Sequence, residues 1–347
     1  MSRKDALAGL LAIGALVAVV LALQFLTPII VGDYHEFTRP TTLAFLRGDS
    51  NLYDAGSFSF YNAPWALAIW LPFVSYPYVV GQSAHELVYI GCLVLSLWLF
   101  QKKMKAPRLG VLFATFNFPV FVLIVAAGID SVVLLGVALG YIAARRRHAG
   151  LLAVALFILA TKPQNVVLVA ALFLYTVREW RAVLLTFGAV IVSGAFIGFD
   201  WIGRYWSYLQ ASPPAAASRV ELWDKLPVPL IVLAALVALA ALAWLVRREG
   251  FTDLTFGLAI TTNLVFGVYI LWAHFVGLIP VVLVIARRDV RLAAVLFVLG
   301  WFLIQPMTYP VAAFVILWLL ALFPLAHRAM PGTTLGVENE NVSNGSA

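Results

Sequence analysis

The segment from Gly32 to Pro64 gathers carboxylates, aromatic side chains and two arginines in a chain that is otherwise poor in charge. Its first acidic residue, Asp33, directly follows a long apolar run. A carboxylate at a helix end beside a desolvated cavity can be tuned towards a general base. We therefore predict that Asp33 is a catalytic base, with a solvated loop aspartate as the alternative.

Other polar residues near Asp33 are candidates for the same cavity. His35 lies within the segment, and His85 lies on the apolar run that follows it. Glu36 and Asp49 can also serve to shape the loop, because Gly48–Asn51 has the composition of a turn. The segment therefore holds more polar side chains than one reaction needs.

The composition indicates the class of protein. Of the 347 residues, 63% are hydrophobic and 11% are charged, whereas soluble domains are about a quarter charged. The net charge is +7, but the basic residues stand in short clusters between apolar runs, where they orient a membrane protein. We predict an all-α polytopic membrane protein in the lipid bilayer of the cell (inner) membrane and no nucleic-acid partner. The single cysteine, Cys92, cannot form an intramolecular disulfide.

The apolar runs predict a bundle of about twelve transmembrane helices with both termini cytoplasmic. The first run is roughly twice too long for a signal peptide, so we expect it to be retained. We predict one transmembrane domain over residues 1–329, with outward loops at 32–83 and 200–226, and a disordered cytoplasmic tail at 330–347. The expected spans lie near residues 6–31, 84–101, 109–127, 131–144, 149–161, 165–177, 182–199, 227–246, 252–272, 275–286, 291–304 and 309–326.

The segment from Pro64 to Tyr78 is expected to lie in the outer interface as a broken helix. If it crossed the membrane, the basic cluster at 102–108 would face outward, against the positive-inside rule. We expect the next helix to begin at a capping box formed by Ser83 and Glu86. With this topology most of the 23 basic residues are cytoplasmic. The exceptions, outward or buried, are Arg39, Arg47, Lys162, Arg204, Arg219 and Lys225.

Lys162 is expected to lie below the outer surface of the membrane. The apolar runs on either side of it, Leu151–Thr161 and Asn165–Val177, are each about 20 Å long, against a hydrocarbon core of about 30 Å. A lysine at that depth needs a wet cavity or an anion. The alternative is that its side chain snorkels to the outer headgroups.

Two more polar residues are predicted near the same depth. His274 precedes the run Phe275–Ala286, which is also too short to cross the membrane alone, although a lone histidine can be an ordinary hydrogen-bonded core residue. Asp130 stands at the outer start of a span, where it either lines the site or caps the helix.

Several familiar motifs are missing from the sequence. It has no Walker lysine motif, no dinucleotide-binding glycine pattern, no cysteine and histidine spacing for zinc, and no nucleophile elbow. These absences argue against nucleotide-driven chemistry on a cytoplasmic domain.

The order of these features resembles that of membrane glycosyltransferases of the GT-C class. Within the class, the chain is similar to the bacterial polyprenol-phosphate-mannose-dependent mannosyltransferases. It departs from that family at Gly128-Ile129, where the family often has Gly-Gln, and at Asn62-Ala63-Pro64, where it often has Tyr-Pro-Pro. The similarity extends to about residue 290 and rests on Asp33, on Leu46-Arg47-Gly48 with Leu52-Tyr53, on Tyr61-Asn62-Ala63-Pro64 with Pro72, on Lys162-Pro163-Gln164, and on Trp272 and His274 followed by Pro280.

This resemblance implies a GT-C-like bundle that transfers a sugar from a polyprenyl-phosphate-linked donor to a glycan or glycolipid acceptor on the outer or periplasmic face. Mannose is the expected sugar, although another hexose or a pentose fits the same residues. Asp33 would remove the proton of the acceptor hydroxyl, giving inversion and roughly 10² to 10⁴ in rate. No cofactor and no metal are implied, and a cation bound beside Asp33 stays open.

The resemblance also implies roles for the other candidates. Lys162, with Arg39 or Arg47, would neutralise the departing lipid phosphate. His274 would orient the acceptor or the phosphate as a second catalytic residue. The expected substrate contacts are Glu36, His35, Tyr61, Asn62, Gln164, Asp130 and Trp272.

A transporter or lipid flippase with an intramembrane site at Lys162 and His274 is the alternative function, since broken helices at mid-depth suit it. The absence of a visible inverted repeat, and the placement of every candidate on the outer half, argue against it. An inactive relative that serves as an assembly partner is a third possibility.

Overall fold

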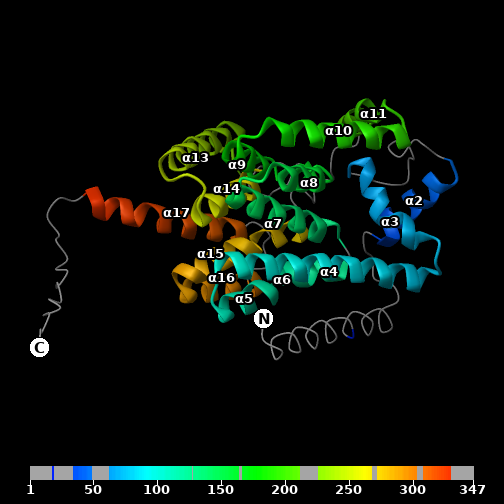
Figure 1. The fold of residues 1–347 in the computed structure, drawn as a ribbon. Helices are drawn as coiled ribbons and strands as arrows, with labels where there is room; N and C mark the ends of the chain where they lie inside the picture. Colours follow the sequence, from blue (N-terminus) through cyan, green and yellow to red (C-terminus); the bar gives the residue numbers. More distant parts are fainter. Residues whose placement is uncertain are drawn as a thin grey trace, which may run out of the picture.

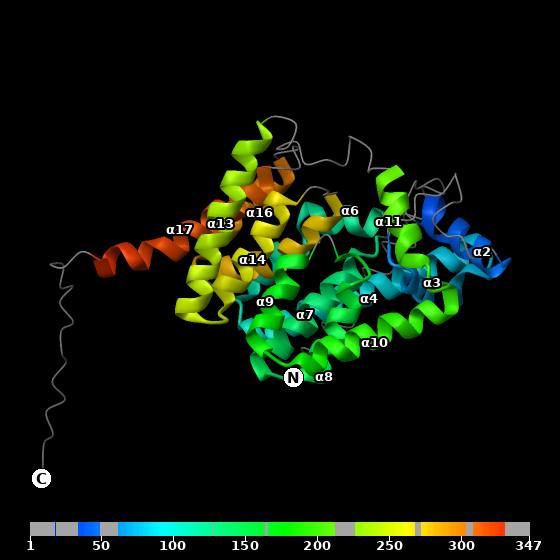
Figure 2. The same ribbon diagram turned by 90° about the horizontal axis from the view of Figure 1, so that it is seen from above.

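The computed structural model describes Ala18 and residues 34–48, 62–126, 128–163, 166–211, 226–267, 272–302 and 308–329. All regular secondary structure in these ranges is helical, which confirms the predicted all-α fold. Figures 1 and 2 show the long helices gathered into one bundle, with α2, α3 and α11 together at one end.

The helices before α7 include the short elements of the first loop and the longest helix, α4. Their bounds are η1 Tyr34–Thr38, α2 Arg39–Leu46, η2 Pro64–Ala66, α3 Leu67–Val74, α4 Tyr78–Met104, α5 Arg108–Thr115 and α6 Phe118–Ala126.

In the described residues, the middle of the chain folds into five helices. They are α7 Asp130–Arg146, α8 Ala149–Leu159, α9 Val167–Val177, α10 Trp180–Ile197 and α11 Trp201–Ala211. The C-terminal helices are α13 Val228–Glu249, α14 Asp253–Phe266, η5 Trp272–Leu278, α15 Ile279–Arg288, α16 Val290–Phe302 and α17 Thr308–Ala329.

Helix α7 forms the centre of the bundle. It packs against α4 on one side and against α8 and α9 on the other, and α10 covers α8 (Figure 1). Nearly every side chain of α7 is buried, including Leu134, Ala138 and Tyr141. The first and last turns of α7 therefore mark the two ends of the core.

Two of the predicted boundaries are wrong. Helix α4 begins at Tyr78 and not at Ser83, whose hydroxyl donates to the carbonyl oxygen of Val79 at 2.8 Å inside the helix. The predicted span near 109–127 is broken between α5 and α6, where the carbonyl oxygen of Asn117 accepts hydrogen bonds from the first turn of α6. The broken helix expected between 64 and 78 is present as η2 and α3.

The described residues contain two helices that are long and apolar enough to cross a membrane, α4 and α13. Several other apolar helices of the described ranges are shorter, among them α8, α9, α14 and α16. The bundle of about twelve spans therefore stays a prediction, as do the loop and tail boundaries. Residues 212–225 and 330–347 lie outside the described ranges.

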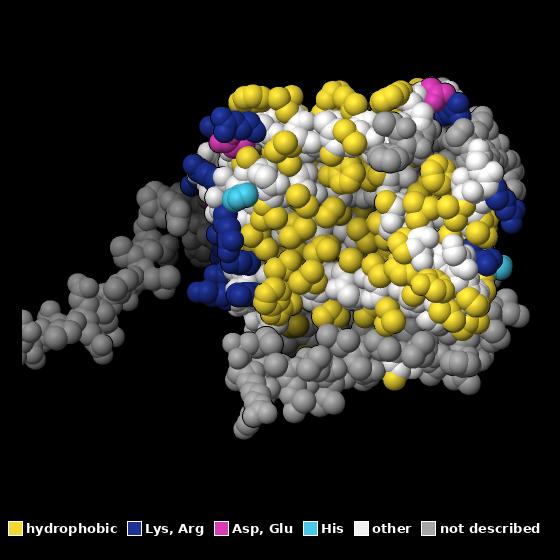
Figure 3. All heavy atoms as spheres, turned by 45° about the vertical axis from the view of Figure 1, so that its right-hand side comes forward, with side chains coloured by type: hydrophobic (Ala, Val, Ile, Leu, Met, Phe, Trp, Pro, Cys, Tyr) yellow, Lys and Arg dark blue, Asp and Glu magenta, His cyan; other side chains and the backbone are white. Residues whose placement is uncertain are grey.

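Apolar side chains cover part of the outside of the bundle. On α10, Leu184 and Phe187 are 55% and 61% exposed, and on α13, Leu233 and Val237 are 59% and 60% exposed. Figure 3 shows hydrophobic side chains across one face and lysine and arginine side chains gathered along one edge. Extended apolar surfaces of this kind are typical of faces that contact lipid or another protein.

Basic residues mark one end of the bundle. Helices α7, α13 and α15 each finish in a pair of arginines. A positive charge in the last turn of a helix is favourable, because the carbonyl groups there carry partial negative charge. The other end of α7 begins with Asp130.

Candidate functional site

Asp130 is the first residue of α7 and is 3% exposed. The partial positive charge of a helix N-terminus favours a carboxylate at this position. The N-cap position of α7 is Ile129, which makes no side-chain capping hydrogen bond. The Asp130 carboxylate contacts two side chains from distant parts of the chain.

The first of these side chains is Lys162, which lies in the turn after α8 and is 6% exposed. Its Nζ donates to Oδ2 of Asp130 at 2.9 Å. Pro163 follows Lys162 and the next helix starts at Val167, so the break in the helical backbone directs the lysine inward. The alternative that Lys162 snorkels to the outer surface is therefore wrong.

The second side chain is His274 of η5, which is 3% exposed. Its Nε2 lies 3.8 Å from Oδ1 of Asp130, on the carboxylate oxygen that Lys162 does not use. At this distance the two groups are neighbours, but these two atoms do not form a hydrogen bond. Lys162 and His274, predicted to share one pocket, lie on either side of one aspartate.

A small cavity of about 30 Å³ opens beside this cluster. Asp130 and His274 supply its polar lining, and the remaining lining is apolar, with Val133, Val166 and Ile260 among its residues. A volume of this size holds one or two water molecules. The cavity can hydrate the buried charges but does not accommodate a sugar ring.

The end of the first loop is joined to the Lys162 turn by a backbone hydrogen bond. The amide of Ala63 donates to the carbonyl oxygen of Thr161 at 3.0 Å. Asn62, which precedes Ala63, is half-buried. Asn62, a predicted substrate contact, is therefore one residue away from a hydrogen bond to Thr161, the neighbour of Lys162.

Aromatic stacking fixes this junction from the outside. Trp65 of η2 stacks on Phe157 of α8 with ring centroids 5.4 Å apart. The ring of Trp201 in α11 meets Trp65 edge-on at 5.3 Å. Helix α11, part of the predicted second outward loop, thus packs over the first loop at the end of the bundle that carries Asp130.

The start of the first loop is anchored at the same end. Tyr34 is 1% exposed, and its ring lies 5.1 Å from that of His85. His85 in turn lies 4.2 Å from Tyr89, which packs in one apolar cluster with Ile129, the neighbour of Asp130. Burial raises the pKa of the Tyr34 phenol, so this hydroxyl stays protonated at neutral pH.

Three predicted residues lie apart from the cluster. Arg39 is half-buried with its guanidinium 5.6 Å above the ring of Tyr78, and the exposed His35 meets the same ring edge-on at 5.6 Å. Arg47 is exposed where α2 ends. Within the described part of the chain, none of the three contacts Lys162, which pairs with Asp130. The predicted role of Arg39 or Arg47 at the donor phosphate stays a prediction.

The other predicted site residues cannot be placed from their side chains. Asp33, Tyr61 and Gln164 lie outside the described residues. For Glu36 in η1 and Trp272 in η5 the structure describes the backbone alone.

A polar cluster in α4 was not predicted as a site component. The amide of Gln82 donates to Glu86 at 3.0 Å, and Nε1 of Trp70 donates to the hydroxyl of Tyr89 at 2.8 Å. The spacing of Gln82, Glu86 and Tyr89 places them on one helix face. This spacing is visible in the sequence and could have predicted the cluster. This face supports the start of the first loop.

We expect replacement of Gly81 by alanine to lower the free energy of unfolding by about 1–3 kcal/mol. A Cβ on Gly81 would lie 2.5 Å from both the hydroxyl oxygen of Tyr34 and the backbone oxygen of Phe73. Thermal unfolding of the detergent-solubilised variant measures the effect. Gly91→Ala in the same helix is the control, because a Cβ there meets no atom within 4 Å. If Gly81→Ala and Gly91→Ala unfold at the same temperature, the close packing of Tyr34 against Gly81 is contradicted.

No family model, no curated protein and no solved structure matches this chain.

Proposed function

We propose that this protein transfers a sugar, mannose in the first instance, from a polyprenyl-phosphate-linked donor to a glycan or glycolipid acceptor. The observation that carries the proposal is the buried cluster of Lys162, Asp130 and His274, to which the end of the first loop is hydrogen-bonded. A buried lysine and histidine around one carboxylate are costly in an apolar bundle and are typical of functional sites.

Lys162 is the residue that we assign to the donor phosphate. Its ammonium group has three N–H donors, and one of them is used by Asp130 at 2.9 Å. A second can contact a phosphate oxygen, whose negative charge increases as the bond to the sugar breaks. The ion pair with Asp130 holds the ammonium group in place, so we assign Asp130 a positioning role instead of a substrate contact.

His274 and Asn62 complete this part of the proposed site. His274 lies across the Asp130 carboxylate from Lys162, where it can orient the acceptor or the phosphate. Asn62 precedes Ala63, whose amide donates to the carbonyl oxygen of Thr161 beside Lys162, and the Asn62 amide can bind sugar hydroxyl groups. We assign the donor phosphate to Lys162 first, because Arg39 and Arg47 do not contact Lys162 in the described part of the chain.

Asp33 is the proposed general base. It takes the proton from the acceptor hydroxyl while that oxygen attacks the anomeric carbon of the donor. The bond from the anomeric carbon to the phosphate oxygen breaks, and polyprenyl phosphate leaves with the bonding electrons. The burial of Tyr34, the residue after Asp33, at the Asp130 end of the bundle supports this assignment.

We propose a multi-pass arrangement in the cell (inner) membrane, with both termini cytoplasmic and the Asp130 end on the outer or periplasmic face. Helices α4 and α13 are long enough to cross, and the exposed apolar faces of α10 and α13 suit contact with lipid. The arginine pairs at the ends of α7, α13 and α15 then face the cytoplasm, as the positive-inside rule requires.

The buried ion pair also favours a second function, transport of an ion or a lipid headgroup. Paired charges inside a membrane domain mark ion pathways in many transporters, and the break between α8 and α9 at Lys162 suits such a site. The two functions differ in their product: an enzyme forms a new glycosidic bond, whereas a transporter moves its substrate unchanged.

The deciding experiment uses purified full-length protein in nanodiscs with synthetic polyprenyl-phosphate-mannose and a membrane glycolipid extract as acceptor. We expect a mannosylated lipid, detected by mass spectrometry, and its loss in Lys162→Met. Donor binding without any covalent product, together with movement of the donor across proteoliposomes, would favour the transporter.

A further inference from the structure

A second charged cluster lies at the opposite end of α7 from Asp130. It surrounds a cavity of about 310 Å³ where the end of α7, the start of α14 and the end of α15 meet. Three of its lining residues are arginines, Arg145, Arg287 and Arg288, and one is acidic, Asp253. The remaining lining residues are Phe251, Thr252, Leu254 and Val284.

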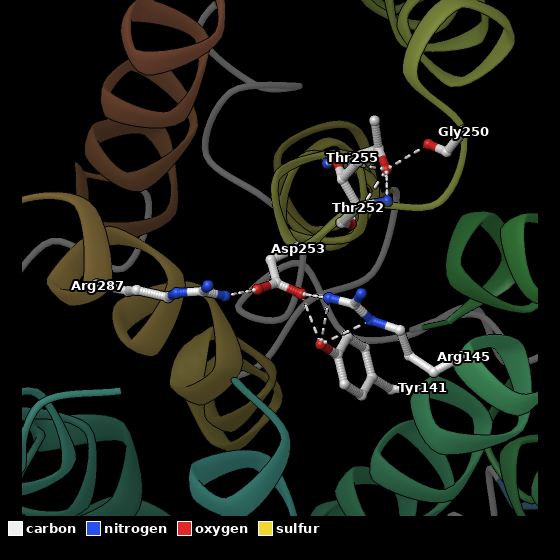
Figure 4. Close-up of polar contacts among 7 residues, drawn as sticks. All are labelled: Tyr141, Arg145, Gly250, Thr252, Asp253, Thr255 and Arg287. Carbon is white, nitrogen blue, oxygen red and sulfur yellow. Dashed lines mark hydrogen bonds and ion pairs between the residues drawn. The ribbon is translucent and has the colours of Figure 1, made fainter. Parts of the chain in front are cut away.

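Asp253 holds two of the arginines in place (Figure 4). Arg145 contacts its Oδ1, and Nη1 of Arg287 contacts its Oδ2 at 2.6 Å. The hydroxyl of Tyr141 donates to Oδ1 at 2.5 Å and accepts hydrogen bonds from Nε and Nη2 of Arg145 at 3.2 and 3.1 Å. The two guanidinium groups are therefore fixed on either side of one carboxylate.

These arginines remain accessible although they are fixed. The side chains of Arg145 and Arg287 are 43% and 47% exposed, while that of Asp253 is 13% exposed. Within the described chain, Nη1 of Arg145 and both Nε and Nη2 of Arg287 make no hydrogen bond. The half-buried carboxylate therefore holds two arginines whose side chains are still partly exposed.

The charges around the cavity do not balance. One carboxylate faces three guanidinium groups, and Arg288 forms no ion pair with the described residues. The N-terminus of α14, capped by Thr252, adds the partial positive charge of a helix start. The cavity therefore has an excess of positive charge and several oriented N–H donors.

We propose that this cavity binds a phosphate group, carried by the headgroup of an anionic phospholipid or by a soluble phosphate. Guanidinium groups match phosphate oxygens with paired hydrogen bonds, and basic cavities between helices at the cytoplasmic face of membrane proteins suit phospholipid headgroups. The volume of about 310 Å³ is within the range of ligand pockets.

The site is separate from the proposed active site. Asp130 and Arg145 stand fifteen positions apart on α7, which corresponds to about 22 Å along the helix at about 1.5 Å per residue. A phosphate at Arg145 and Arg287 cannot be the donor phosphate at Lys162. Phosphate binding at this cavity therefore does not depend on whether the protein transfers a sugar at Lys162.

The test measures saturable binding to the purified full-length protein in detergent by native mass spectrometry and thermal stabilisation. The probes are dioctanoyl phosphatidic acid, dioctanoyl phosphatidylcholine and inorganic phosphate. We expect the phosphatidic acid to bind and stabilise the protein, and phosphatidylcholine to bind much more weakly. If inorganic phosphate stabilises the protein equally well, the proposed site stands and its ligand is a soluble phosphate.

Two variants and one control assign the binding to this cavity. Arg287→Gln and Arg288→Gln should each weaken binding about fivefold. Arg288→Gln leaves the contacts of Asp253 intact, so it keeps the test valid if Arg287→Gln folds poorly. The control is Arg248→Gln at the end of α13, where the exposed guanidinium lies 5.2 Å above the ring of Trp244 and does not line the cavity. Equal weakening in the control, or no saturable binding of any probe, would overturn the proposal.

Discussion

Replacing Asp130 with alanine is expected to lower the free energy of unfolding by about 3–5 kcal/mol. The change removes the carboxylate that lies 2.9 Å from the ammonium group of Lys162, and both side chains are almost completely buried. A lysine left without a partner in an apolar environment must lose its proton or disrupt the packing around it. Denaturation of the detergent-solubilised protein, followed by circular dichroism, measures the loss.

The double variant Asp130→Leu with Lys162→Met separates stability from function. Both charges are then absent and the volumes are similar, so the free energy of unfolding should return to about that of the wild type or above it. We expect this stable variant to have no transferase activity, because the donor phosphate loses its cation. An Asp130→Ala variant that loses less than about 1 kcal/mol would show that the pair is not buried as described.

The sequence predicted that Lys162 and His274 share one site, but it did not predict the carboxylate between them. The short apolar runs on either side of Lys162 and after His274 predict that both residues lie below the membrane surface, and this depth stays a prediction. In the structure the two side chains are buried on either side of Asp130. Hydropathy reports how much apolar chain surrounds a residue. It does not report which helices are neighbours, and Asp130 therefore remained equally consistent with a helix cap.

The helices themselves were predictable because a strongly apolar run rarely has another structure in this type of chain. The predicted spans near 149–161 and 227–246 correspond to α8 and α13. The errors occurred at two of the predicted boundaries. At Ser83 the capping pattern lies inside a helix that already begins after Pro77. Near Asn117 the predicted span contains Pro119, which cannot donate a backbone hydrogen bond, and the helix is divided into α5 and α6.

At the basic end of the bundle, too, the sequence did not predict which charged side chains form pairs. The positive-inside rule placed Arg145, Arg287 and Arg288 together on one side of the membrane. It treats them as equivalent charges, whereas the structure distinguishes the two that Asp253 holds from the one that it does not. Asp253 follows Thr252 at the start of α14, and a sequence pattern that reads only as a helix start does not predict its two arginine partners.

Replacing Asp33 with asparagine is expected to reduce the rate of sugar transfer by about 10² to 10⁴. Asparagine keeps the size and the hydrogen-bonding capacity of the side chain but cannot accept the proton of the acceptor hydroxyl. The rate of product formation from polyprenyl-phosphate-mannose, at saturating donor and acceptor, measures the effect. Donor binding should be unchanged, because Lys162 and His274 are intact in this variant.

The matched control is Asp49→Asn, in the same segment, where the composition of Gly48–Asn51 predicts a turn. We expect it to keep the wild-type rate, since a turn-forming aspartate tolerates asparagine. Both variants should unfold at the wild-type temperature, which excludes a loss of folding. If Asp33→Asn transfers sugar at the full rate while Lys162→Met does not, Asp33 is not the base and the cluster around Asp130 alone carries the reaction. If Asp33→Asn and Lys162→Met are both fully active, the buried charges serve another function and the proposal of glycosyl transfer at this site is wrong.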